Sequence, residues 1–161
     1  MNKQQIYDYL NSKNIPFEKL EHQPVYNMEQ LTEIDMPHKE YEAKNLFLRD
    51  DKRKNYYLVT IKGDKKIDLK EVRKKYQTRP LTFASEEELF SILQLKKGAV
   101  TPLGLLNDKE RKVHFLLDET FTPTSLIGIH PNDNTATIWL KVNDVLSIIK
   151  EHGNQIDIVS I

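Results

Sequence analysis

The chain has 161 residues, of which 39% are hydrophobic and 30% charged, and its 24 basic residues balance its 24 acidic ones. This length and composition predict one soluble domain over residues 1–161 that buries about two thirds of the surface exposed by the unfolded chain. Balanced charge gives no whole-molecule attraction for nucleic acid, so any polyanion contact must be local. The absence of cysteine excludes disulfides and cysteine-ligated metals, and no apolar run approaches the ~20 residues that cross a bilayer. The polar N-terminus lacks a signal-peptide core, so we expect a cytoplasmic monomer with no membrane contact.

The first predicted elements are short. Gln4–Leu10 has apolar residues one turn apart and is typical of an amphipathic helix. Phe17–His22 predicts a brief strand. Asn27–Ile34 predicts a second helix, because Asn27 and Gln30 have the spacing of a capping box.

A β-hairpin and two capped helices are predicted next. The hairpin pairs Ala43–Leu48 with Tyr56–Ile61, both rich in apolar and β-branched residues, across a charged turn. Asp68 caps a helix that ends before a short strand at Leu81–Phe83. Ser85, followed three residues later by a glutamate, forms a capping box that opens a helix leading to the loop at Gly98.

The remaining chain alternates strands with one helix. The expected elements are strands at Lys112–Leu117, Ser125–Ile129, Thr135–Trp139 and Ile156–Val159, and a helix over Val142–Ile149 closed by Gly153. Strands with intervening helices, and no linker or repeat, indicate a single α/β domain built on a mixed sheet.

Familiar catalytic motifs are missing from the sequence. There is no Gly-x-Ser-x-Gly elbow, phosphate-binding P-loop, Gly-x-Gly-x-x-Gly or His-Glu-x-x-His. The five histidines show no ligand-like spacing, so we expect neither a metal nor a cofactor. What remains are three separated polar segments beside predicted strands, which indicate a substrate site assembled by the fold.

The sequence motifs in these three segments are similar to those of a known protein family. Lys-Asn-Leu-Phe-Leu at Lys44–Leu48, Gly-x-Val-Thr-Pro-x-Gly-Leu-x-Asn-Asp at Gly98–Asp108 and His-Pro-x-x-Asn-Thr at His130–Thr135 together resemble the prolyl-tRNA editing family. More narrowly, the chain looks like the free-standing alanyl-tRNA(Pro) deacylases, relatives of the editing insertion of bacterial prolyl-tRNA synthetases. The resemblance covers most of the chain, including Ser85–Leu89 and the helix start at Asp68.

The resemblance implies a fold and a function. The fold would be a mixed, mostly antiparallel and partly barrel-like sheet surrounded by helices. The activity would be hydrolysis of alanine wrongly attached to proline tRNA, with the acceptor end of tRNA(Pro) as partner and prolyl-tRNA synthetase as a second partner. Such an enzyme uses a positioned water and needs no protein nucleophile.

Lys44 and Asn45 are the first candidate site residues. In the resemblance Lys44 is catalytic, and its ammonium can hold a phosphate, a ribose oxygen or the ester carbonyl. The alternative is a solvated lysine at a strand start. Asn45 alternates to the opposite strand face, so it is either a bulged, substrate-binding partner of Lys44 or a structural cap.

The loop Gly98, Ala99, Val100, Thr101 and Pro102 is the second candidate, as a substrate-binding segment. Glycine allows a close approach, so backbone N–H groups here can face the ester oxygen, while the small side chains shape the amino-acid cavity. The alternative is a helix C-cap at Gly98 followed by a turn.

His130 is the third candidate, catalytic through positioning of the alanine moiety or the attacking water. A lone histidine at a strand end is otherwise usually structural. The same motif brings Asn134 in as a substrate-binding residue.

Two further features bear on nucleic acid. A local basic stretch is a candidate for phosphate contacts or simply a solvated face, and it comprises Lys62, Lys65, Lys66, Lys70, Arg73, Lys74, Lys75 and Arg79. Tyr56 and Tyr57 can stack on a terminal base, although core positions suit them and Trp139 better.

Three functions therefore compete: removal of alanine from tRNA(Pro), removal of another amino acid such as cysteine, and a non-catalytic module that senses aminoacyl-tRNA.

Overall fold

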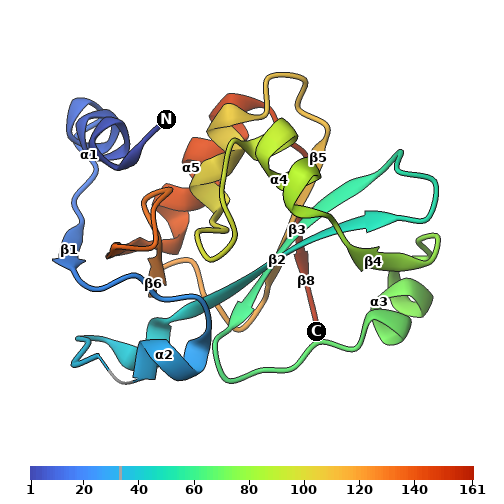
Figure 1. Cartoon of the computed structure of the whole chain (residues 1–161), viewed down its shortest axis with the longest axis horizontal. Helices are drawn as coiled ribbons and strands as arrows, with labels where there is room; N and C mark the ends of the chain where they lie inside the picture. Colours follow the sequence, from blue (N-terminus) through green and yellow to red (C-terminus); the bar gives the residue numbers. More distant parts are fainter. Residues whose placement is uncertain (33) are drawn as a thin grey trace.

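Two β-sheets form the framework of the protein in the computed structural model, which describes residues 1–32 and 34–161 (Figure 1). The strands are β1 (Glu18–Glu21), β2 (Ala43–Asp50), β3 (Tyr56–Lys62), β4 (Leu81–Phe83), β5 (Val113–Asp118), β6 (Leu126–Ile129), β7 (Ala136–Lys141) and β8 (Ile156–Val159). The larger sheet has the order β4–β2–β3–β5–β8, and the smaller one β1–β7–β6. In neither sheet does the first strand pair with the last, so both sheets are open.

The larger sheet is mixed because of how its strands are connected. The hairpin of β2 and β3 is antiparallel, with a continuous register from Ala43 opposite Lys62 to Arg49 opposite Tyr56. Strands β5 and β8 are each reached by long connections that contain helices, and both pair in parallel. Pairing of β2 with β4, β1 with β7, and β6 with β7 is antiparallel. The expected α/β class with a mixed, mostly antiparallel sheet is therefore confirmed, with the strands divided over two sheets.

The helices begin where the sequence supplies capping side chains. They are α1 (Lys3–Ser12), α2 (Met28–Thr32), α3 (Leu69–Tyr76), α4 (Glu86–Leu93) and α5 (Val142–His152), with 3-10 turns η1 (Lys39–Tyr41) and η2 (Pro102–Asn107). Asp68 caps α3, and Ser85 with Glu88 forms the capping box of α4, as predicted. Gly153 closes α5 with a φ of +106°, a conformation that suits glycine.

Some boundaries differ from the sequence prediction. The helix expected over Asn27–Ile34 is observed as α2 over Met28–Thr32, and Glu33 lies outside the described residues. Helix α1 starts at Lys3 rather than Gln4, because Asn2 and Gln5 form a capping box that the sequence prediction did not include. The loop that begins at Gly98 leads into η2 at Pro102, with Thr101 as its N-cap, an element that the sequence prediction did not include.

Helices cover both faces of the larger sheet. On one face the main core packs against α4 and α5, with Leu93 and Ile149, and it extends to the smaller sheet and to Ile6 of α1, which lies beside β1 (Figure 1). On the opposite face a smaller core joins the sheet to α3 (Figure 1). Glu88 fixes α4 to the sheet, since it pairs with Arg49 at 3.0 Å and accepts from the Tyr56 hydroxyl at 2.7 Å.

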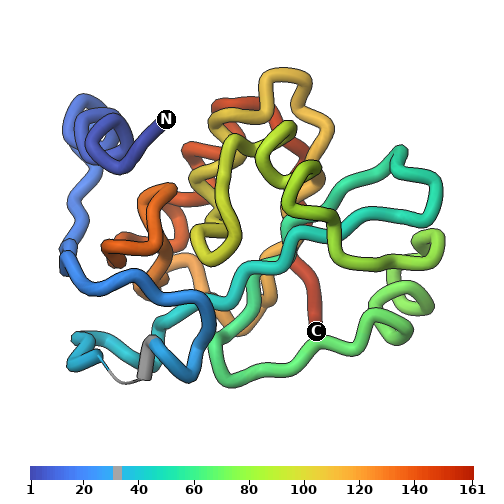
Figure 2. Tube along the Cα trace, viewed as in Figure 1, coloured from blue at the N-terminus to red at the C-terminus, as the bar shows by residue number. Residues whose placement is uncertain are grey.

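A third hydrophobic cluster lies where the segment after β1 meets the smaller sheet. It contains Val25, Met36 and the fully buried Trp139. Figure 2 traces this segment in blue as it passes the start of β2 in cyan. The junction between the two sheets is therefore walled by chain segments that are distant in sequence, and it is here that the candidate site forms.

Candidate active site

A cavity of about 400 Å³ opens at the junction of the two sheets. It brings together residues from all three sequence segments that resemble the editing family, namely Lys44, Asn45, Gly98, Val100 and His130. The rest of its wall consists of Val25, Tyr26, Asn27, Met28, Glu42, Ala43, Leu46, Gly128, Ile129 and Thr137. Polar groups thus sit on mostly apolar walls, as is usual in small-molecule sites.

Four consecutive residues of β2, Ala43 to Leu46, line this cavity because it opens along a free strand edge. Strand β4 covers β2 only from Leu48 onward. Main-chain groups alternate along a strand, and the Phe47 carbonyl accepts from Ala84 N on the β4 side while the Glu42 carbonyl accepts from Gly63 N on the β3 side. By this alternation the main-chain N–H of Asn45 points off the free edge, toward the cavity.

Lys44 lines the cavity, and its ammonium is held by the main chain of the segment after β3. Its Nζ donates to the carbonyl oxygen of Lys65 at 3.0 Å. That acceptor is neutral, so the contact orients the side chain without cancelling its charge. The side chain is half-buried, which differs from the freely solvated lysine that was the alternative interpretation.

Asn45 is held by the neighbouring strand. Its Oδ1 accepts from the Thr60 hydroxyl at 2.5 Å, and Thr60 is its partner in the β2–β3 register. Because that register is continuous from residue 43 to 49, the bulge considered from the sequence is wrong. Asn45 reaches the cavity because the cavity opens at the strand edge, where both faces are accessible.

Gly98 supplies a backbone shape that other residues adopt poorly. Its φ is +88°, and a Cβ there would lie 2.8 Å from Tyr26 Cδ1 and 3.2 Å from Asn134 Nδ2. The C-cap interpretation of Gly98 is wrong, because α4 ends at Leu93 and its C-cap is Gln94. Glycine is therefore required by a close chain crossing at the cavity mouth.

Of the other residues of the loop from Gly98 to Pro102, one lines the cavity and the rest support the loop from outside it. Val100 lines the cavity, whereas Ala99, Thr101 and Pro102 are buried outside it. The Ala99 N–H donates to the Lys96 carbonyl at 3.1 Å, and Pro102 has no N–H, so neither can serve as a donor to substrate. Thr101 Oγ1 donates to the carbonyl oxygen of His130 at 2.7 Å, which ties this loop to the end of β6.

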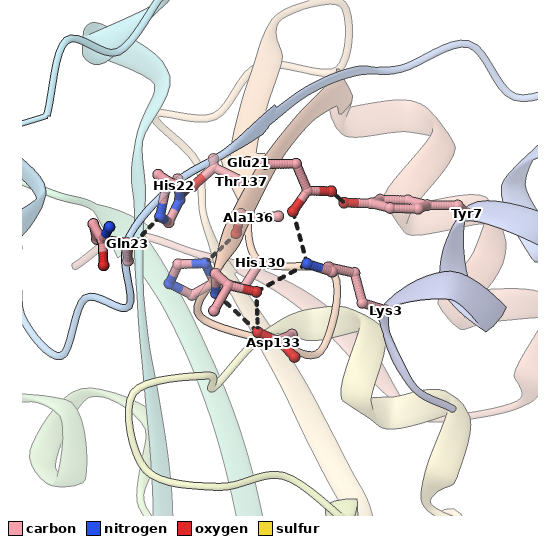
Figure 3. A network of polar contacts seen from close by, with 10 residues as sticks. Lys3, Tyr7, Glu21, His22, Gln23, His130, Asp133, Ala136 and Thr137 are labelled. Atoms are coloured by element: carbon pink, nitrogen blue, oxygen red, sulfur yellow. Dashed lines mark hydrogen bonds and ion pairs between the residues drawn. The ribbon is translucent and has the colours of Figure 1, made fainter.

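His130 has its tautomer set by the main chain. Its Nδ1 lies 2.7 Å from the carbonyl oxygen of Ala136, and since a carbonyl only accepts, Nδ1 must carry the proton (Figure 3). Burial lowers the pKa of His130, nearby His22 acts in the same direction, and the Ala136 contact and Asp133 oppose them. In the neutral ring Nε2 is therefore a hydrogen-bond acceptor.

A polar network holds the segment that carries His130. Lys3 from α1 donates to Glu21 at 2.7 Å and to Thr135 Oγ1 at 2.9 Å (Figure 3). Asp133 accepts from the main-chain N–H of Thr135 at 2.9 Å. His22 contacts Thr137 Oγ1 at 2.9 Å, and its ring centroid lies 6.2 Å from that of His130.

Asn134 acts beside the cavity rather than in its wall. Its Nδ2 donates to the Val25 carbonyl at 2.9 Å, and the Val25 N–H returns a bond to the Asn134 carbonyl at 3.3 Å. This pair fastens the segment carrying Tyr26, a 59% exposed aromatic at the cavity mouth, against Gly98.

Glu42 and Gly128 are cavity residues that the sequence analysis missed. They meet through an isolated parallel bridge just before β2. Burial raises the pKa of Glu42 to about 7, and the indole of Trp139 opposes that rise. The only sequence signal was a glutamate just before the predicted strand, two residues before Lys44, and this pattern does not separate a buried carboxylate from a solvated one.

Other candidates lie away from the cavity. Tyr56 is buried, with its hydroxyl on Glu88, so its base-stacking interpretation is wrong, and Trp139 is in the core as expected. Tyr57 packs beside His114 and does not line the cavity.

The basic stretch is partly engaged within the protein. Lys65 pairs with the buried Asp118 at 2.6 Å, and Arg79 with Asp51 at 2.7 Å. Lys75 donates to the Ser160 carbonyl at 2.9 Å. Besides Lys75, the exposed cations of the stretch on and before α3 are Lys66, Lys70, Arg73 and Lys74.

Neither a metal-binding cluster nor a membrane-spanning helix is present in the described part of the chain. Among residues 1–32 and 34–161, no three His, Cys, Asp or Glu side chains converge in a way that could hold a metal ion. In the same residues, no helix is both long and apolar enough to pass through a bilayer.

Comparison with known proteins agrees with this arrangement. Residues 22–148 match the model of the aminoacyl-tRNA editing domain. The chain is 42% identical to the prolyl-tRNA editing protein ProX of Acetoanaerobium sticklandii, covering 94% of this chain and 93% of that protein. It is 35% identical to the prolyl-tRNA synthetase associated domain-containing protein 1 of Mus musculus, covering 90% of this chain and 88% of the relative.

Solved structures share the fold at low sequence identity. A crystal structure described as a candidate trans-editing enzyme for prolyl tRNA synthetase superposes with a TM-score of 0.69 at 16% identity, over 99% of this chain and 96% of that one. The fold and site define an aminoacyl-tRNA deacylase, an enzyme that hydrolyses the ester between an amino acid and tRNA. The chain belongs to the aminoacyl-tRNA editing family.

Proposed function

We propose that this protein is a trans-editing enzyme that removes alanine from mischarged tRNA(Pro). The observation that carries the proposal is the convergence of Lys44, Gly98 and His130 on one cavity, in a chain 42% identical to a prolyl-tRNA editing protein. We also propose that the chain acts as one domain, as a monomer in the cytoplasm.

Discrimination between amino acids makes such an enzyme necessary. Alanine is smaller than proline, and a missing methylene changes binding by only about 1–3 kcal/mol, so a pocket for proline cannot exclude alanine well. A second site with a small cavity corrects the error. In this proposal Val100, Ile129 and Met28 limit the size of the side chain admitted.

The reaction requires a positioned water. Water attacks the ester carbonyl carbon, the bond to the ribose oxygen breaks, and the water's proton ends on that oxygen, releasing alanine and tRNA. Lys44 stabilises the charge that develops on the carbonyl oxygen, and the Asn45 main-chain N–H at the free edge of β2 is a second donor. Nε2 of His130 accepts a hydrogen bond from the water or the alanine amine. The ribose hydroxyl of the substrate assists the proton transfer.

The tRNA approaches over the exposed side of the cavity. Tyr26 at the mouth offers an aromatic face to the terminal nucleoside. Lys66, Lys70, Arg73 and Lys74 contact backbone phosphates, so binding weakens as salt rises. A prolyl-tRNA synthetase is the natural second partner, since it produces the mischarged substrate.

A panel of charged tRNAs tests the proposal. The protein is incubated with alanyl-, cysteinyl- and prolyl-tRNA(Pro) and with alanyl-tRNA of another acceptor, and the release of labelled amino acid is followed. We expect rapid release from alanyl-tRNA(Pro) alone. Faster release of cysteine would redirect the activity to a second mischarged species, and tight binding of all four without turnover would establish a sensing module instead.

A further inference from the structure

Glu42 is a buried carboxylate in the cavity wall that the proposed hydrolysis does not use. It is 6% exposed, and its Oε1 has no hydrogen-bond partner within residues 1–32 and 34–161. Burying a carboxylate away from water is costly unless a partner compensates it. An unpartnered carboxylate in the wall of a ligand-sized cavity is therefore suited to bind a group of the substrate that can compensate its charge.

The surroundings of Glu42 leave room for that partner. A Cβ on Gly128 would lie 3.1 Å from Glu42 Oε1 and 2.7 Å from Nε1 of Trp139, so glycine keeps the space beside the carboxylate open. Nε1 of Trp139 lies beside the same carboxylate and favours its charged form, but the indole N–H and Glu42 Oε1 are not in hydrogen-bonding geometry, so both still lack a partner in the described part of the chain. The titratable side chains that share the cavity with Glu42 are Lys44, His130 and Tyr26.

The substrate class has one cation that matches this position. An aminoacyl ester carries a free α-ammonium group one carbon from the ester carbonyl, and a buried carboxylate is its natural counter-charge. Lys44, two residues along the chain on the same cavity wall, carries the opposite charge and suits the ester and ribose oxygens. The two ends of the aminoacyl ester thus have separate partners.

We propose that Glu42 binds the α-ammonium group of the aminoacyl ester and makes the enzyme selective for substrates with a free amine. This rests on the proposed function for the identity of the ester. An ester with a blocked amine, such as N-acetylalanyl-tRNA, or with a hydroxyl in its place, such as lactyl-tRNA, leaves the carboxylate buried and unpaired. Such substrates are rejected even though the bond to be broken is the same.

Binding of stable analogues tests this without requiring turnover. The probes are 3′-alanylamino-3′-deoxyadenosine, in which an amide replaces the ester, and its N-acetyl counterpart, titrated by calorimetry. We expect wild type to bind the free amine at least about tenfold more tightly than the acetylated probe, a difference of one charge-assisted contact. In Glu42→Gln this ratio should fall to near one, and Glu42→Asp should restore part of it.

The control is Glu40→Gln, which removes an exposed carboxylate two residues earlier and should keep the wild-type ratio. Equal affinity of wild type for the two probes, or no binding of either, overturns the assignment of Glu42. So does an undiminished ratio in Glu42→Gln. Hydrolysis of alanyl-tRNA(Pro) is measured in parallel, and amine selectivity without hydrolysis would reject the proposed function while retaining the role of Glu42.

Discussion

The hydroxyl of Thr101 donates to the carbonyl oxygen of His130 at 2.7 Å, which joins the loop after Gly98 to the strand end that carries the histidine. Thr101 is fully buried and also caps η2. Two segments separated by about thirty residues in sequence are thereby held in one geometry at the cavity. We therefore expect Thr101 to act as a positioning residue, whereas the sequence analysis suggested contact with substrate.

Replacing Thr101 with valine tests this link. The change keeps the shape but leaves the His130 carbonyl without its buried donor, which costs about 1–3 kcal/mol of unfolding free energy. We expect a lower midpoint in urea unfolding and a reduced kcat for deacylation with a smaller change in KM. Thr101→Ser, which retains the hydroxyl, should recover most of both, and a valine variant with wild-type kcat would separate this bond from function.

Lys44→Ala removes the ammonium group of a residue that lines the cavity. The loss of one group that stabilises transition-state charge lowers rates by about 10²–10³-fold, so we expect a decrease of that order in single-turnover deacylation. Stability should change little, because the side chain makes its hydrogen bond to a main-chain carbonyl rather than packing in the core. Lys150→Ala, at an exposed position of α5 outside both the cavity and the basic stretch, is the matched control. Wild-type turnover in Lys44→Ala would remove this residue from the mechanism.

Gly98→Ala introduces a methyl group at a crowded, left-handed position. The new Cβ would meet Tyr26 at 2.8 Å, so we expect displacement of the Tyr26 segment, weaker substrate binding and a loss of about 1–3 kcal/mol of stability from backbone strain. Gly153→Ala is the control, because Gly153 also has a positive φ but lies at the end of α5, away from the cavity. The control should lose stability and keep its KM, and an equal rise of KM in both variants would contradict the local explanation.

The pH dependence of His130 follows from its burial. Because burial lowers its pKa below the ordinary value, the ring is neutral at pH 7 and accepts hydrogen bonds through Nε2. We expect kcat/KM to fall with acid in two overlapping steps, one from Glu42, whose pKa is about 7, and one from His130 below about 6.5, its unperturbed value. Stability should fall in the same direction, since the unfolded chain binds a proton at higher pH than the folded one. Imidazole NMR titration provides the check, and a His130 pKa above 6.5 would refute the argument.

Glu42→Gln should stabilise the protein at alkaline pH. The pKa of Glu42 rises on folding from 4.5 to about 7, so the folded state resists ionisation and stability declines as pH increases through this interval. Above pH 7 the full cost of the ionised carboxyl is about 3 kcal/mol as an upper limit. The variant should therefore melt higher than wild type at pH 8 and little differently at pH 4. A lower melting temperature at pH 8 would show that Glu42 is already compensated.

Local patterns predicted many elements well. Asp68 and Ser85 mark helix starts because their side chains bond backbone N–H groups within three residues, an interaction that needs no tertiary context. The β2–β3 hairpin follows from two apolar runs separated by a charged turn. By contrast, the sequence suggested Gly98 as the C-cap of α4, but Gln94 is the C-cap. Local sequence did not reveal this, because a left-handed C-cap does not require glycine.

The sequence by itself determined the family, the residue types in the three segments and the order of strands and helices, since these depend on neighbours along the chain. Only the tertiary structure decided which members of each segment face the cavity, separating Val100 from Ala99 and Thr101, and it alone revealed Glu42 beside Gly128. The physical reason is that burial and the environment of a charge arise where segments distant in sequence pack together. The raised pKa of Glu42 therefore could not be predicted from the residues next to it in the sequence.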